Sequence, residues 1–227
     1  MKKSIQKIFN ASAPEIQQLI RDRNWQNLVD RNKIVRILNF VKDEILFGFT
    51  PRPLLPASQV LAAGCGQAIS KSILLKTLLD ACGILCRYHA FTVKKELYRG
   101  LARPLEYHLL PAVLPSSWIE VFFEGQWLIA DGVLLDSAYL QGLQPMLTGA
   151  QNEYIGRGIA LYLPANTPTV WNGKNHTYCQ RAAITRDLGI IDDFEWFFQE
   201  YRRDIRQLGN IGPKHANRMI NALRYPE

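Results

Sequence analysis

The stretch GCGQAISKSILLKTLLDACGI, residues 64–84, decides the fold because a glycine-rich turn leads directly into a long apolar segment. From Ala68 to Cys82 the apolar positions cover nearly the whole circumference of a helix, which is typical of a helix buried on most sides. Gly83 then ends the segment, since glycine readily adopts the left-handed conformation found after helix C-termini. We therefore expect a central buried helix that begins at about Ala68.

The segments after this helix change to a period of two, which predicts an antiparallel sheet. The expected strands are 86–93, a hairpin over 118–130 with its turn at Glu124-Gly125, 154–163 and 180–185. Helices are expected at 33–47, as a short turn over 58–60, and at 193–207 and 214–223. Helices followed by strands and then helices predict an α+β fold. We expect a single domain over 1–227, with N-terminal helices in 1–50, the core in 57–190 and a helical tail in 191–227.

Composition bounds the class of protein. The 227 residues are 48% hydrophobic and 21% charged, which are ordinary values for a globular chain. The first residues contain two lysines but no apolar core, so we expect no secretory signal, no membrane span and a cytoplasmic location. Four scattered cysteines then indicate reduced thiols rather than disulfides, and no partners complete a zinc site around Cys82 and Cys86. The net charge of +7 suits acidic partners, but a solvated surface explains it as well.

A nucleophile in the first turn of such a helix suits thiol catalysis. The helix N-terminus carries partial positive charge and free N–H groups, which lower the pKa of a thiol and can bind an oxyanion. A base from a neighbouring strand and a carboxylate on the next strand would complete a Cys-His-Asp triad.

Two blocks of the sequence resemble the transglutaminase-like superfamily, which has a papain-like fold. The first is PASQVLAAGCGQAISKSILLKTLLDACGILCRYHAF, and the second is the hairpin SSWIEVFFEGQWLIADG. The flanking segments VKDEILFGF and QRAAITRDLGIIDDFEWFFQEY are similar to a bacterial subgroup, so the resemblance covers about residues 33–224. It implies cysteine acyl chemistry by an acyltransferase or hydrolase. An amide, ester or thioester would be attacked, and the acyl group would pass to an amine or to water.

The resemblance assigns catalytic positions that this chain fills unusually. The nucleophile position falls on Ala68 and the base position on Ser116, while the carboxylate position is kept as Asp131, with Asp136 a weaker candidate. Alanine cannot attack a carbonyl, and serine cannot act as a base near neutral pH as imidazole does. The triad is therefore broken at two positions.

Three interpretations follow, in this order of preference. The natural protein carries cysteine at position 68 and this chain is a variant without it, or the chain is a pseudoenzyme whose cleft binds a ligand or a protein, or Cys65 has become the nucleophile. His108 is the best substitute for a base at Ser116. Gln67 precedes the nucleophile position, where its side-chain amide could assist an oxyanion or stabilise the turn. The resemblance places Trp118 beside the base, where core packing or lining of an acyl pocket would explain it.

The resemblance implies an acyl substrate, which could be a small molecule, a carrier-bound acyl group or a protein amide, together with an amine acceptor or water. We expect neither a metal nor another cofactor. A rival from another class is the segment LGNIGPKHANRMI, residues 208–220, which resembles the helix-hairpin-helix module of nucleic-acid-binding proteins. Its turn at Gly209–Gly212 and the cations Lys214 and Arg218 would contact phosphates. We rank nucleic-acid binding below the acyl and pseudoenzyme interpretations.

Overall fold

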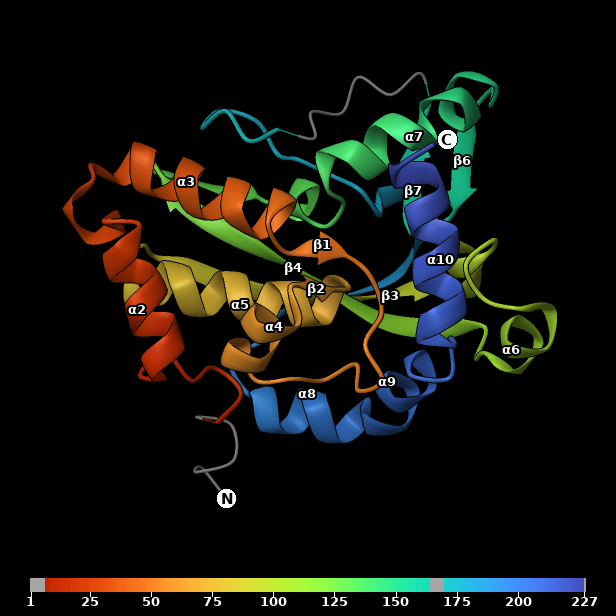
Figure 1. Cartoon of the computed structure of the whole chain (residues 1–227), viewed down its shortest axis with the longest axis horizontal. Coiled ribbons are helices and arrows are strands. Elements are labelled where there is room, and N and C mark those ends of the chain that lie inside the picture. Colours follow the sequence, from red (N-terminus) through yellow and green to blue (C-terminus); the bar gives the residue numbers. More distant parts are fainter. Residues whose placement is uncertain (1–6, 164–169, 227) are drawn as a thin grey trace.

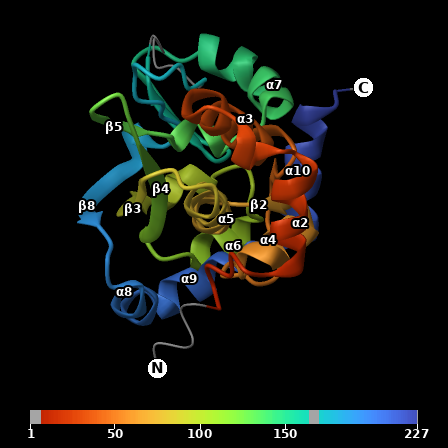
Figure 2. The same ribbon diagram turned by 90° about the vertical axis from the view of Figure 1, so that its left-hand side faces the viewer.

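The computed structural model describes residues 7–163 and 170–226 and has an α+β fold arranged around one helix (Figure 1). That helix is α5 (Ala68–Ala81), and the inward side chains along its length are fully buried. Viewed along α5, the main sheet covers one side and helices α2, α3 and α4 cover the other (Figure 2). The observed helix starts at the residue that the sequence predicts, and Gly83 follows it with a φ of 75°. In the described part of the chain, no helix is long and apolar enough to cross a membrane.

The main sheet has four antiparallel strands in the order β5-β4-β3-β8. Their bounds are β3 (Cys86–Lys94), β4 (Val113–Phe123), β5 (Gln126–Ile129) and β8 (Ile184–Ile190). Glu124 and Gly125 both have positive φ values, 47° and 82°, as a tight hairpin turn requires. The predicted hairpin is therefore present, and β4 begins five residues before Trp118 because it also pairs with the full length of β3.

Small elements connect the helices that cover α5. The bounds of these elements are α2 (Pro14–Asp22), α3 (Asp30–Asp43), β1 (Leu46–Phe47), α4 (Ala57–Ala63) and β2 (Cys65–Gly66). Strands β1 and β2 pair in parallel, which holds the turn before α5 against the end of α3. Gly66 is needed there, because a Cβ atom would lie only 2.5 Å from the Ser70 hydroxyl.

The remaining elements surround this centre. They are α6 (Pro104–Leu109), α7 (Ser137–Thr148), β6 (Glu153–Gly156), β7 (Ile159–Tyr162), α8 (Phe194–Glu200), α9 (Arg202–Leu208) and α10 (Pro213–Arg224). The last helix packs across α7 so closely that a Cβ on Gly142 would overlap the carbonyl of Leu223. The tail is therefore an integrated part of the fold.

Several predicted boundaries are wrong for identifiable reasons. The strand expected at 154–163 is a hairpin, because Arg157 and Gly158 adopt positive φ values of 53° and 83°. The helix expected at 193–207 is divided at Tyr201, whose ψ of 12° leaves the helical range. The helix expected at 33–47 ends at Asp43, and the strand expected at 180–185 lies four residues later as β8. Helix α7 has no counterpart among the predicted elements.

Candidate functional site

The first turn of α5 carries the position predicted for a nucleophile. Gln67 is the N-cap, and its backbone N–H donates to the hydroxyl of Ser70 at 3.0 Å, which fixes the start of the helix. Ala68 follows as the first helical residue and is 6% exposed. The side-chain nitrogen of Gln67 is buried and has no hydrogen-bond partner among the described residues. The helix N-terminus expected for an oxyanion site is therefore formed, but it is covered.

Ser116 and Asp131 belong to one buried hydrogen-bonded chain that a third residue completes. The Ser116 hydroxyl donates to Oε1 of Gln180 at 2.6 Å, and Nε2 of Gln180 donates to Oδ1 of Asp131 at 2.9 Å. Gln180 therefore lies between the residues at the predicted base and carboxylate positions. All three are almost completely buried. The amide side chain satisfies both neighbours, as buried polar groups require.

The second carboxylate oxygen of Asp131 is also satisfied. Its Oδ2 accepts the backbone N–H groups of Cys179 at 2.6 Å and of Gln180 at 2.8 Å. Each of these donors to the carboxylate is an uncharged amide. Burial raises the pKa of Asp131 even though these amide hydrogen bonds oppose the rise. Asp131 lies beside a cavity at Ala68, and it contacts no imidazole among the described residues.

A very small cavity separates Ala68 from Asp131. Its volume is about 10 Å³, enough for a single water molecule at most. The cavity is lined by Ala68, Lys71, Ser72, Ser117, Trp118, Ala130, Asp131, Val133 and Leu134. An acyl group could enter only if these elements moved apart, and none of the lining side chains is a thiol or an imidazole.

A match to a protein-family model covers the part of the chain that carries most of this site. Residues 20–132 match the model of the transglutaminase-like superfamily, and this range includes the first turn of α5, Ser116 and Asp131. The chain belongs to the transglutaminase-like superfamily. No curated protein and no solved structure gave a match. The predicted family and its α+β core are thus confirmed.

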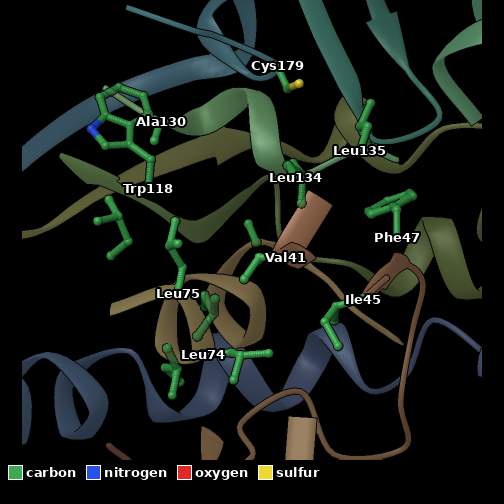
Figure 3. Close-up of a cluster of buried hydrophobic side chains, with 14 of the residues drawn as sticks. Val41, Ile45, Phe47, Leu74, Leu75, Trp118, Ala130, Leu134, Leu135 and Cys179 are labelled. Atoms are coloured by element: carbon green, nitrogen blue, oxygen red, sulfur yellow. The ribbon is translucent and has the colours of Figure 1, made fainter. Parts of the chain in front are cut away.

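Trp118 has the role of a core residue in this transglutaminase-like domain. It is 6% exposed and belongs to the buried cluster of Figure 3, where it lies near Ala130. Its ring also contacts Phe91 at a centroid distance of 4.3 Å and Tyr178 at 5.9 Å. In this conformation the side chain packs in the core and lines the small cavity beside Ala68.

The two substitute residues predicted for catalysis lie away from the cavity. His108 is exposed on α6 and is not among the lining residues. Cys65 lies in β2 with its Cβ near Gly48, and burial raises the pKa of its thiol, opposite to the shift that a nucleophile needs. The structure therefore brings neither residue to Asp131.

Asp136, the weaker carboxylate candidate, has a different environment. Its carboxylate forms an ion pair with Arg224 at 2.6 Å, and its Oδ1 accepts the N–H of Tyr139 at the start of α7. The Phe47 N–H donates to its Oδ2 at 3.0 Å. Asp136 joins the last helix to the core and is not a lining residue of the cavity.

Sequence reasoning missed two buried residues beside the site. Gln180 belongs to no catalytic motif that the sequence analysis identifies. It lies 49 positions from Asp131 in the sequence, and only the fold brings the two side chains together. The sequence alone assigns no role to Lys71. It is 1% exposed, its ammonium donates to the carbonyls of Leu134 at 3.0 Å and Lys42 at 3.3 Å, and burial lowers its pKa to about 7.

The helical hairpin at the tail has an acidic neighbour. Helices α9 and α10 flank the turn Gly209–Gly212, as the helix-hairpin-helix resemblance predicts. A Cβ on Gly212 would lie 2.7 Å from Oε1 of Glu106, so a carboxylate occupies the space beside the turn. A carboxylate there repels the phosphate that such a turn would bind.

Proposed function

We propose that this chain is a non-catalytic transglutaminase-like domain that acts by binding rather than by acyl transfer. The observation that supports this proposal best is the Ser116–Gln180–Asp131 chain of hydrogen bonds. It uses the carboxylate that would orient a catalytic histidine, and it pairs the polar groups of the three side chains with one another rather than with a substrate.

The cavity beside Ala68 supports the same proposal. Acyl transfer needs a nucleophile within about 3–3.5 Å of a carbonyl carbon and room for the tetrahedral intermediate. A volume of about 10 Å³ next to a methyl side chain offers neither. A ligand of the domain would therefore bind elsewhere on the molecule, and the family cleft itself would serve as a structural core.

The second candidate is the cysteine acyltransferase or hydrolase that the sequence favours. Its support is the retained scaffold: α5 begins at position 68, and Asp131 is buried beside the same cavity. If cysteine at position 68 were sufficient, its thiolate would attack an acyl donor, expel the leaving group and form a thioester that water or an amine resolves.

One set of variants separates the two candidates. The chain as given, Ala68→Cys and the double variant Ala68→Cys/Ser116→His would be treated with p-nitrophenyl acetate and with iodoacetamide, and adducts would be located by peptide mass spectrometry. We expect Ala68→Cys to form no acyl adduct at position 68 and to be alkylated far more slowly than a control, Ala63→Cys, at an exposed position.

A burst of p-nitrophenolate with a thioester at position 68 in the single variant would contradict the non-catalytic proposal and support the enzyme. A burst in the double variant alone would show that both lost groups are needed, which agrees with the proposal for the chain as given. Circular dichroism on each variant would show that the fold is retained.

A further inference from the structure

A second pocket, far larger than the cavity at Ala68, lies between the proline-rich connector that precedes α4 and helices α8 and α9. Figure 1 shows the connector, in orange, running beside these two blue helices. The pocket has a volume of about 380 Å³, within the range of about 300–1,000 Å³ typical of small-molecule sites. It is lined by Pro51, Arg52, Pro53, Leu54, Phe198, Arg202, Ile205 and Arg206.

The walls of this pocket are held rigidly. Pro51 and Pro53 restrict the connector backbone, and the Thr50 hydroxyl donates to the Arg52 carbonyl at 2.8 Å. The connector approaches the end of α9 closely, since a Cβ on Gly209 would lie 3.2 Å from the Pro51 carbonyl oxygen. A pocket between such walls exists before any ligand arrives, which lowers the entropic cost of binding.

The floor and the rim of the pocket differ in chemistry. Phe198 and Ile205 are 8% and 3% exposed and belong to the hydrophobic core, so they present apolar surface at the base. The polar side chains that line the pocket are the guanidinium groups of Arg52, Arg202 and Arg206. No lining residue is acidic.

The three arginines have no ion-pair partner within the described residues. Arg52 donates only to the amide oxygen of Gln59 at 3.3 Å, and the side chains of Arg202 and Arg206 make no hydrogen bond or ion pair there. Arg202 and Arg206 are four residues apart on α9, where like charges repel. An anion between them would relieve this repulsion and accept paired N–H groups from either guanidinium.

We propose that this pocket binds a small amphiphilic organic anion, with its carboxylate or phosphate between Arg202 and Arg206 and its apolar part against Phe198 and Leu54. This proposal rests on the proposed function, because it names the class of ligand that the non-catalytic domain would bind. It uses no residue of the Ala68 cavity.

The probes are octanoate, octyl phosphate, octanol and octylamine, each kept below its critical micelle concentration and measured by calorimetry against the full chain at low salt. We expect one or both anions to bind at least about tenfold more tightly than octanol, since their hydrogen bonds to the guanidinium groups are charge-assisted. Octylamine should not bind. Raising the salt concentration should weaken the anions and leave octanol unchanged.

Variants locate the site. Arg202→Gln/Arg206→Gln should weaken the binding of octanoate and octyl phosphate by about tenfold or more while keeping much of the aliphatic part of both side chains. The control is Arg203→Gln, an exposed arginine of the same helix that does not line the pocket, and it should bind as the parent does. Thermal melts would confirm that all variants fold.

The outcomes are distinct. Preference for the phosphate or the carboxylate identifies the head group of the ligand and supports the proposal. Octanol binding as tightly as both anions, an equal loss in Arg203→Gln, or no binding of either anion at millimolar concentration would overturn it. None of these results depends on position 68, so failure here leaves the non-catalytic proposal standing, and a reactive Ala68→Cys variant leaves the pocket proposal standing.

Discussion

Two aspartates on one short segment, Asp131 and Asp136, are buried to nearly the same extent and are satisfied in opposite ways. They are 2% and 1% exposed. Asp131 accepts neutral amide donors, from Cys179 and Gln180, whereas Asp136 accepts two hydrogen bonds from the guanidinium of Arg224. Similar burial therefore gives two electrostatic environments.

The pKa shifts follow from this difference. Burial raises the pKa of Asp131, because neutral donors do not compensate fully for the lost hydration of the charge. Burial acts in the same direction on Asp136, but the hydrogen bonds and charge of Arg224 exceed it and lower the pKa of that carboxyl group. A cation that accompanies a buried carboxylate into the core therefore favours the ionised form of that carboxylate.

The two aspartates also join different parts of the chain. Through Arg224, Asp136 connects the last helix with Phe47, whose carbonyl accepts from the same guanidinium at 2.7 Å. Through Gln180, Asp131 connects the segment before β8 with Ser116 on β4. The carboxylate that the family resemblance assigns to catalysis, Asp131, is thus held by uncharged amide donors. The ion pair between Asp136 and Arg224 attaches the last helix to the core.

Removing the cation should give the largest effect. Arg224→Met leaves the carboxylate of Asp136 buried without a counter-charge, and breaking such a pair costs about 3–5 kcal/mol. The free energy of unfolding from urea denaturation would measure the loss. The matched control is Arg218→Met on the same helix, where the arginine is exposed and its side chain contacts His215 at 3.4 Å.

The control should change stability by less than about 0.5 kcal/mol. If Arg224→Met were as stable as Arg218→Met, the ion pair would not stabilise the attachment of α10. The two aspartates would then differ in pKa but not in their contribution to stability. Replacing both partners, as Asp136→Asn/Arg224→Met, should recover part of the loss because no uncompensated charge then remains buried.

The sequence predicts the centre of the fold well because local signals agree there. The apolar circumference of α5, the glycine after it and the Glu124-Gly125 turn are all short-range patterns, and the structure has each of them at the predicted residues. The hairpin at Arg157-Gly158 was missed because arginine is not a usual residue for a positive φ.

The candidate site was less predictable because its contacts are long-range. Ala68, Ser116 and Asp131 could be placed by resemblance, but Gln180 has no motif and contacts Ser116 across 64 positions. Arg224 belongs to no sequence motif, and only the packing of α10 on α7 shows that it is buried against Asp136. Hydrogen-bond partners that are distant in sequence leave no periodic signal.

The same isosteric change at both aspartates sharpens the comparison. Asp136→Asn leaves Arg224 buried without a counter-charge and should cost about 2–4 kcal/mol at neutral pH. Asp131→Asn should cost less than about 1 kcal/mol, because the side-chain amide of Gln180 can reverse its orientation. It can turn its oxygen toward the new NH₂ group at position 131 and its nitrogen toward the Ser116 hydroxyl. Urea denaturation of both variants measures the difference.

The pH dependence of these two variants should have opposite sign. Asp136 has a folded pKa below the ordinary value of 3.8. Its ionised carboxylate therefore contributes to the free energy of unfolding above pH 3.8, and this contribution is lost as the pH falls through the folded pKa. Asp131 has a folded pKa above 3.8, so its ionisation removes stability as the pH rises from 3.8 through the folded pKa. Relative to the parent, Asp131→Asn should therefore gain stability with rising pH and Asp136→Asn should lose it. Parallel curves for the two variants would contradict the assignment.

A similarly small effect should come from the hydroxyl of Ser116, at one end of the Ser116–Gln180–Asp131 chain. Ser116→Ala removes the donor to Oε1 of Gln180 and leaves that buried oxygen unpaired, at a cost of about 1 kcal/mol. The neighbouring Ser117→Ala is a close control, because Ser117 is also buried but its hydroxyl interacts with Tyr88 and takes no part in the Ser116–Gln180–Asp131 chain. Its removal should cost less than removal of the Ser116 hydroxyl, because no hydrogen bond of good geometry is lost. If both serine variants lowered the free energy of unfolding by the same amount, burial of the side chain would account for the effect. The Ser116–Gln180–Asp131 chain of hydrogen bonds would then contribute no stability of its own.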